Sequence, residues 1–225
     1  MSKLEGRTGI LLSIEGMSGS GKTSTSIALK KMLEKNKHTV LLLGGFEIHT
    51  YSSPITRFCR ELVQKNRFVG LPWNSEIYLL IAELLFDIEQ LVKPALIQGQ
   101  IVIFDGYWDS LIAYESARIK LLEPERSKVA IEYINSIINT IFTFQTIPQP
   151  DYTVYLDCDL MDTKIRLENR DNLPVSAKDL ELQMEIDRQY SLVFEGRTII
   201  RIKNDNSSDQ QSNVKKILDN IQFSL

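Results

Sequence analysis

The sequence predicts an α/β domain in which a five-stranded parallel sheet is flanked by helices. Five short runs are nearly continuous in apolar or β-branched residues, as expected of strands buried on both faces of a parallel sheet. Helical patterns lie between these runs, and such alternation favours a doubly wound sheet with right-handed crossovers. A glycine-rich segment with the spacing of a phosphate-binding loop joins the first run to the first helical pattern.

The strands are expected where the apolar runs stand. Each run is nearly continuous in hydrophobicity, without the polar–apolar alternation of a strand that has one solvated face. The runs are residues 9–14, 39–43, 101–104, 153–157 and 198–202.

Helical patterns fill the intervals between these strands. The first follows the glycine-rich segment and carries apolar residues over 27–33. A second pattern covers 75–92, where Ser75 can cap the helix and Pro94 limits its continuation. A third covers 124–144.

One domain is expected over residues 1–225. The polar stretch 203–213 is a loop between the last strand and the last helix, and it is too short to be a domain linker. The sequence contains no repeats and no low-complexity segment.

The composition is that of an ordinary soluble globular protein, with 43% hydrophobic and 24% charged residues and a net charge of −3. This charge does not favour a nucleic acid polymer or an anionic membrane as a partner. No apolar stretch approaches the roughly 20 residues of a membrane span. Two cysteines without a CxxC pattern, Cys59 and Cys158, indicate a reducing compartment. The histidines, His38 and His49, are too few for a metal or triad site. We therefore expect a cytoplasmic protein.

The segment Gly-Met-Ser-Gly-Ser-Gly-Lys-Thr-Ser over 16–24 fits the phosphate-binding pattern G-x-x-x-x-G-K-[ST]. Glycines allow successive backbone N–H groups to point at phosphate oxygens. Lys22 can reach the β- and γ-phosphates, and the Thr23 hydroxyl can bind Mg²⁺. The alternative is a glycine-rich turn without a nucleotide, which the strand before and the helix after disfavour. The predicted ATP-binding residues are Gly16, Ser18, Gly19, Ser20, Gly21, Lys22, Thr23 and Ser24.

Asp105 directly follows the apolar run 101–104. In parallel sheets, ligands lie outside the carboxyl ends of the strands, so a carboxylate there can meet metal and phosphates. Asp105 is predicted to hold Mg²⁺ with Thr23, or to receive or orient the proton of an acceptor hydroxyl. The alternative is an aspartate that caps a helix or forms a turn.

Arg166 and Arg170 lie four residues apart in a helical, charged segment after the fourth strand. Phosphoryl transfer requires positive charge over the equatorial oxygens of the moving group, which a small lid around residues 160–178 can supply. The alternative is a solvated charged face. The pattern favours neither, and the predicted catalytic residues are Lys22, Asp105, Arg166 and Arg170.

Further motifs on both sides of the loop extend along nearly the full chain and, in this order, resemble the thymidylate kinase family. They are Ser13–Gly16, Lys93–Leu96, Val102–Asp105, the set Tyr107, Asp109, Ser110, Ala113 and Tyr114, then Pro150–Asp157 and Leu167–Arg170.

The resemblance implies the fold of P-loop kinases with sheet order 2-3-1-4-5, ATP and Mg²⁺ as cofactors, and lid arginines over the transferred phosphate. It also implies that adenine lies near the loop after the last strand, so Asn204 is a predicted ATP-binding residue.

Differences from the family concentrate on the acceptor side. This chain has Ser18 where family members carry an acid, and Leu84 and Gly106 where they carry arginines. It has Glu115 where they carry a glutamine. The segment after the second strand, 44–49, lacks the family's arginine. Because arginines are the usual clamp for a phosphate dianion, thymidylate is predicted to be a poor acceptor unless Arg57 or Arg60 restores the clamp. The predicted acceptor-binding residues are Phe46, Glu47, Tyr107 and Glu115.

Three functions follow from these observations. The first is a kinase that moves the γ-phosphoryl group of ATP to a small acceptor, a nucleotide or nucleoside other than thymidylate. The second is a kinase of a hydroxylated metabolite that has no base. The third is an inactive ATP-binding switch or scaffold, which the joint presence of Lys22, Thr23, Asp105 and the lid arginines disfavours. The expected partners are ATP and a small-molecule acceptor, with a homodimer as a possible assembly.

Overall fold

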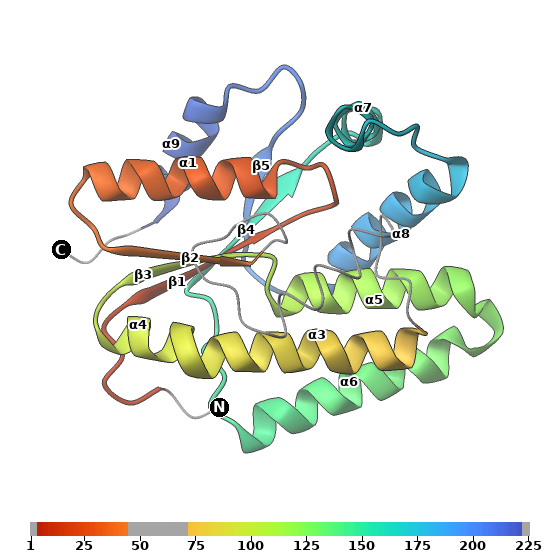
Figure 1. Ribbon diagram of the computed structural model, residues 1–225, viewed down its shortest axis with the longest axis horizontal. Helices are drawn as coiled ribbons and strands as arrows, with labels where there is room; N and C mark the ends of the chain where they lie inside the picture. Colours follow the sequence, from red (N-terminus) through yellow and green to blue (C-terminus); the bar gives the residue numbers. More distant parts are fainter. Residues whose placement is uncertain (1–3, 45–71, 222–225) are drawn as a thin grey trace.

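The computed structural model describes residues 4–44 and 72–221. Its five strands form one parallel sheet in the order β2-β3-β1-β4-β5, which confirms the predicted topology (Figure 1). The strands lie within about two residues of their predicted positions. They are β1 (Ile10–Glu15), β2 (Val40–Gly44), β3 (Ile101–Asp105), β4 (Tyr152–Asp157) and β5 (Ile200–Lys203).

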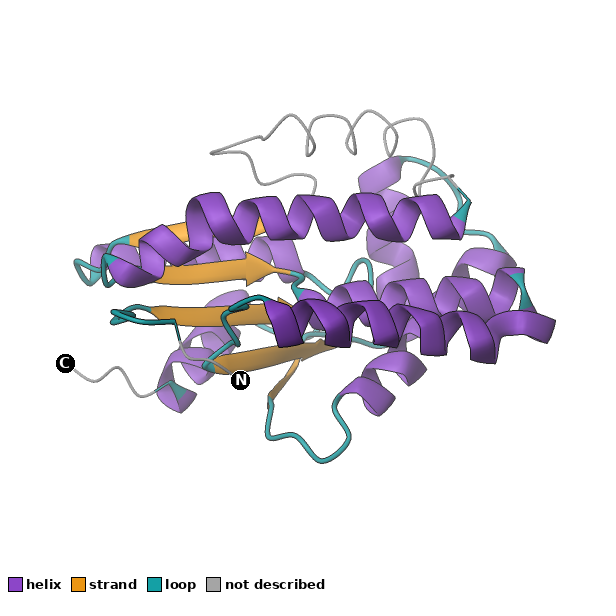
Figure 2. Ribbon diagram, turned by 90° about the horizontal axis from the view of Figure 1, so that it is seen from below, coloured by secondary structure: helices purple, strands orange, loops and turns teal. Residues whose placement is uncertain are grey.

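Helices cover both faces of this sheet. Figure 1 shows α1 and α9 on one side and α3, α4 and α6 on the other, and the helices of this second layer lie in front of the strands in Figure 2. The helical elements are α1 (Lys22–Lys35), α3 (Trp73–Asp87), η1 (Ile88–Val92), α4 (Lys93–Ile97), α5 (Trp108–Leu122), η2 (Pro124–Arg126), α6 (Ser127–Phe144), α7 (Leu160–Asp171), α8 (Ala177–Val193) and α9 (Gln210–Asn220).

Alternating strand residues divide the core between the two faces. On β3, Ile101 and Ile103 pack with α1 and α9, whereas Val102 and Phe104 pack with the layer that contains α3, α5 and α6. Both sets are buried because each face is covered, which is why the strands read as continuous apolar runs in the sequence.

The helix predicted over 75–92 begins earlier and continues further. It starts at Trp73 after Pro72, without a side-chain cap, so Ser75 does not cap it. The helix also passes Pro94, because the π-helical turn η1 lies just before α4 and the proline occupies its first turn. Proline is tolerated in a first turn, and the change of hydrogen-bond register in a π-helical turn leaves room for its missing N–H.

The bounds of the other predicted segments agree more closely with the structure. The helix over 124–144 forms as η2 followed by α6. The predicted loop 203–213 is shorter, since α9 begins at Gln210, where the Asp209 side chain accepts a hydrogen bond from the Ser212 N–H. In the part of the chain that the structure describes, none of the helices has the length and apolar character that crossing a membrane requires.

Candidate active site

The phosphate-binding loop joins the end of β1 to the start of α1. Gly16, Gly19 and Gly21 have backbone φ angles of 148°, 80° and 92°, which residues other than glycine rarely adopt. A Cβ at Gly21 would lie 2.5 Å from the Asn204 amide nitrogen. Because α1 begins at Lys22, its N-terminal end faces the loop and favours a bound anion.

Lys22 lies inside this loop. Its Nζ donates to the carbonyl oxygens of Gly16 at 2.8 Å and Met17 at 3.0 Å, and to the Tyr114 hydroxyl at 3.2 Å. Burial lowers the pKa of Lys22, but the nearby Tyr114, Asp105 and Glu15 outweigh it and the net pKa is raised. The side chain is therefore a fixed positive charge at the place where phosphates would bind.

Thr23 and Asp105 meet at the carboxyl end of the sheet. The Thr23 Oγ1 donates to Asp105 Oδ2 at 2.6 Å, and Asp105 is 4% exposed at the end of β3. Helix α5 begins later, after Tyr107 and without a side-chain cap, so Asp105 does not cap it. A hydroxyl beside one carboxylate fits Mg²⁺, which is usually held by one or two protein oxygens plus phosphates and waters. The described residues contain no cluster of three or more His, Cys, Asp or Glu that could hold a metal alone.

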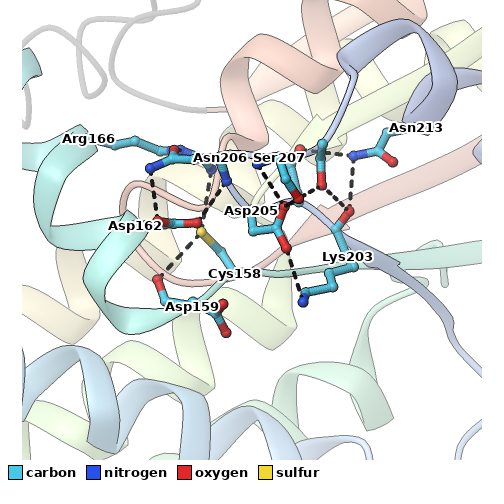
Figure 3. Close-up of polar contacts among 11 residues, drawn as sticks. Cys158, Asp159, Asp162, Arg166, Lys203, Asp205, Asn206, Ser207 and Asn213 are labelled. Atoms are coloured by element: carbon cyan, nitrogen blue, oxygen red, sulfur yellow. Dashed lines mark hydrogen bonds and ion pairs between the residues drawn. The ribbon is translucent and has the colours of Figure 1, made fainter.

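Asn204 and Arg166 contact the loop on the side of Gly19 and Ser20. The Asn204 Nδ2 donates to the Ser20 carbonyl at 2.6 Å, and Arg166 Nη1 lies 3.4 Å from the Gly19 carbonyl. The Arg166 Nε donates to Asn206 Oδ1 at 3.1 Å (Figure 3). Two hydrogen bonds from Asn206 to Asp162 tie the segment after β5 to α7. The predicted lid arginine Arg166 and the predicted adenine-side Asn204 are thus brought together at the loop.

The opposite side of the loop contacts α5 and α8. The Ser18 hydroxyl lies 3.2 Å from the Tyr114 hydroxyl, and the Ser18 N–H donates to Gln183 Oε1 at 3.0 Å. Gln183 is fully buried, and its Nε2 makes no hydrogen bond with any residue that the structure describes. The sequence analysis missed Gln183, because 165 residues separate it from Ser18 and no local pattern marks it.

Two predicted acceptor residues lie within the described chain. Glu115 is 2% exposed, and both its carboxylate oxygens lie near Arg118 Nη1, at 3.3 and 3.4 Å. Arg118 also pairs with Glu76 on α3. Burial raises the pKa of Glu115 to about 7; Arg118 opposes this increase and Glu76 adds to it.

Tyr107 lies largely in the core, and its role in acceptor binding stays a prediction. Its ring is 2% exposed and packs against Phe104, with ring centroids 4.9 Å apart, and its hydroxyl donates to the Pro148 carbonyl at 3.0 Å. An aromatic ring among apolar neighbours is more stable in the core than at a wet site, and the buried hydroxyl already has its partner.

The chain is similar in sequence to known proteins. The family model described as thymidylate kinase matches residues 14–215. The chain belongs to the thymidylate kinase family. It is 30% identical over 199 residues to the probable thymidylate kinase of Pyrococcus abyssi, covering 87% of this chain and 88% of that one. It is 32% identical over 165 residues to the thymidylate kinase of Mesoplasma florum, covering 72% and 69%.

Solved structures support the same fold. The thymidylate kinase of Candida albicans aligns with a TM-score of 0.69 at 20% identity, covering 95% of this chain and 90% of that chain. The thymidylate kinase of Ehrlichia chaffeensis aligns with a TM-score of 0.64 at 20% identity, covering 95% and 99%. This member of the thymidylate kinase family is a P-loop nucleotide kinase, an ATP-dependent phosphotransferase.

The structure describes two positions at which the resemblance implies an arginine, Leu84 and Gly106. Leu84 is buried in the core with the other apolar residues of α3. Gly106 has a φ of 80°, and a Cβ there would lie 3.0 Å from the Ser110 Oγ. An arginine at either position would need a different local packing or backbone. Phe46 and Glu47, like Arg57 and Arg60, lie outside the described residues.

Arg170 differs from Arg166 in its surroundings. Its Nε donates to Asp171 Oδ1 at 2.7 Å, and its side chain is 46% exposed. The role of Arg170 over the transferred phosphate stays a prediction. The predicted ATP contact of Ser24, which is exposed in the first turn of α1, also stays a prediction.

Proposed function

We propose that this protein transfers the γ-phosphoryl group of ATP to a nucleoside monophosphate, with thymidylate as the first acceptor to test. The contact between Thr23 and Asp105 beside the loop carries the proposal, because it joins a phosphate-binding loop to a metal-binding carboxylate. The names of the relatives support thymidylate as the acceptor.

In this proposal Lys22 neutralises the β- and γ-phosphates, and the backbone N–H groups of the loop and of the first turn of α1 bind their oxygens. Thr23 and Asp105 would hold Mg²⁺, which supplies positive charge across the β- and γ-phosphates when it is bound. Arg166 contributes a guanidinium beside Gly19 and Ser20 and stabilises negative charge that develops during transfer.

Asn204 supports the nucleotide indirectly. Its amide holds the Ser20 carbonyl, and its own Oδ1 accepts from Asn213 Nδ2 at 2.9 Å. The loop is therefore tied to the segment after β5, near which the adenine would lie. Asn204 thus orients the loop and borders the base.

Thymidylate is thus the first candidate acceptor, and the second candidate is a nucleotide or nucleoside other than thymidylate. The buried Leu84 and the positive φ angle of Gly106 favour this second candidate, since neither residue provides a cation for a substrate phosphate. Glu115 is a further difference, because it stands where the resemblance implies a glutamine and is buried beside Arg118. A hydroxylated acceptor without a base remains the third possibility within the same chemistry.

The test is ADP formation from Mg·ATP with a panel of acceptors. The panel contains thymidylate, the other nucleoside monophosphates, the corresponding nucleosides and several sugars. Lys22→Ala protein, purified in parallel, measures any activity from contaminating kinases. We expect a nucleoside monophosphate to give the highest kcat/KM, with turnover of roughly 1–100 s⁻¹.

Thymidylate as the best acceptor, with a micromolar KM, would support the first candidate and overturn the predicted poor use of thymidylate. A different nucleotide as best acceptor would support the second. If no nucleotide raises ADP formation above the Lys22→Ala background, nucleoside monophosphate phosphorylation is ruled out.

A further inference from the structure

Glu15 is a carboxylate in the interior of the protein. It is the last residue of β1, immediately before Gly16 of the phosphate-binding loop, and it is completely buried. A buried carboxylate is costly unless hydrogen bonds compensate for the lost water. Burial raises the pKa of Glu15, and Asp109 raises it further, while hydrogen bonds from Ser110, Ser13 and the Tyr107 backbone oppose the change.

Three donors and a fourth hydroxyl, from different parts of the chain, surround this carboxylate. The Oε1 accepts from the Ser13 hydroxyl and, at 3.0 Å, from the Tyr107 N–H. The Oε2 accepts from the Ser110 hydroxyl and lies 3.2 Å from the Tyr190 hydroxyl. An ionised carboxylate accepts about four hydrogen bonds, whereas a neutral amide has one oxygen and would set its own N–H groups against some of these donors.

The contacts of Glu15 reach the metal-binding side of the site. The Tyr107 N–H belongs to the turn directly after Asp105, and the Gly106 N–H of the same turn donates to the Ile14 carbonyl at 2.9 Å. These two hydrogen bonds fix the turn to the end of β1. They thereby set where Asp105 stands relative to Thr23.

The contacts also reach the phosphate side. The Tyr190 hydroxyl lies 3.2 Å from Glu15 Oε2, 3.3 Å from the Gly16 carbonyl and 2.7 Å from the Ser110 hydroxyl, and its single proton serves one of these acceptors at a time. The same Gly16 carbonyl accepts from Lys22 Nζ at 2.8 Å. Glu15 and the carbonyl that accepts from the loop lysine therefore share the hydroxyl of one tyrosine on α8.

We propose that Glu15 is a positioning residue for phosphoryl transfer, which holds Asp105 and Gly16 at the separation that ATP and Mg²⁺ require. It acts through Tyr107, Ser110 and Tyr190 and touches no reacting atom. Helix α8 thereby becomes part of the apparatus that orders the loop. The inference rests on the proposed function for its kinetic readout and is independent of the acceptor for its binding readout.

The test compares Glu15→Gln and Tyr190→Phe with the wild-type protein. Tyr155→Phe is the matched control, because its ring packs against that of Tyr190 with centroids 5.2 Å apart while its hydroxyl donates to Asp187 instead. ATP binding is measured by calorimetry over a series of Mg²⁺ concentrations, and turnover is measured with the best acceptor of the panel. Thermal unfolding midpoints are recorded for every variant.

We expect Glu15→Gln and Tyr190→Phe to raise the Mg²⁺ concentration for half-maximal ATP affinity and to lower kcat. Each effect should be about tenfold, as expected for the loss of roughly one hydrogen bond to a charged group. ATP affinity without Mg²⁺ should change less than threefold, and Tyr155→Phe should match the wild type in both readouts. If Glu15→Gln does not fold, Tyr190→Phe and Ser110→Ala provide the same measurement with one donor removed.

Unfolding midpoints that fall while Mg²⁺ dependence and kcat stay within twofold of wild type would overturn the proposal and leave Glu15 with a purely structural role. If wild-type protein binds ATP with Mg²⁺ but phosphorylates no acceptor, the proposed function fails. The Mg²⁺ dependence of binding then still decides the role of Glu15.

Discussion

Replacing Glu115 by glutamine should stabilise the protein above neutral pH and change little in acid. The carboxylate is 2% exposed on α5 and shares the guanidinium of Arg118 with Glu76, so two buried carboxylates compete for one cation. Glutamine has nearly the same shape and can accept a hydrogen bond from Arg118, but it cannot ionise. The substitution leaves Arg118 paired with Glu76.

The magnitude follows from the pKa of Glu115, which burial raises from 4.5 to about 7. A carboxyl whose pKa is higher in the folded state binds its proton more tightly there, so it favours folding fully below pH 4.5. This contribution is lost as the pH rises through about 7. Each tenfold change in proton affinity is about 1.4 kcal/mol, which gives roughly 3 kcal/mol across this range.

The assay is urea unfolding of wild type and Glu115→Gln at pH 5 and pH 8. The variant should gain about 2–3 kcal/mol relative to the wild type between the two pH values, after allowance for relaxation around the buried site. Glu185→Gln is the control, since Glu185 pairs at 3.0 Å with Lys120, whose side chain is 35% exposed. A free energy difference between Glu115→Gln and wild type that is the same at both pH values, or that reverses in sign, would refute this account.

Three other predictions concern the loop and its surroundings. Lys22→Ala removes a fixed charge, so turnover measured by ADP formation should fall about 100-fold or more. Arg166→Ala and Arg170→Ala should depress kcat while ATP affinity by calorimetry changes only a few fold; an unchanged kcat in both would assign them to a solvated face. Gly106→Ala should lower the free energy of unfolding by about 1 kcal/mol, because its φ is 80°; equal stability in urea would contradict this.

Much of the fold could be predicted because its signals are local. A strand buried on both faces is apolar at nearly every position. The sequence around Ile101–Asp105 therefore predicts a strand of a parallel sheet even when the neighbouring strands are unknown. The loop from Gly16 to Thr23 is equally local, since it needs glycines and one lysine at fixed spacing. Sheet order followed from the family resemblance, and the structure agrees with it.

The remaining features depend on contacts that sequence patterns do not record. Pro94 was expected to limit the helix, but a change of hydrogen-bond register before it keeps the helix continuous. Tyr107 lies two residues after Asp105, close to the site in sequence, yet its ring packs into the core. For Glu15 a signal was present, because a charged residue at the end of an apolar strand is unusual and must find partners.

The two sides of the loop offer a way to separate the two substrates. Arg166 and Asn204 contact the carbonyls of Gly19 and Ser20, whereas Gln183 contacts the backbone of Ser18. Ser18, where the resemblance implies an acid, lies on the second of these sides. If ATP occupies the Asn204 side, substitutions there should alter ATP affinity first. Substitutions at Gln183 should alter the KM of the acceptor first, because its buried N–H group is satisfied by no described residue and a ligand oxygen can supply the missing hydrogen bond.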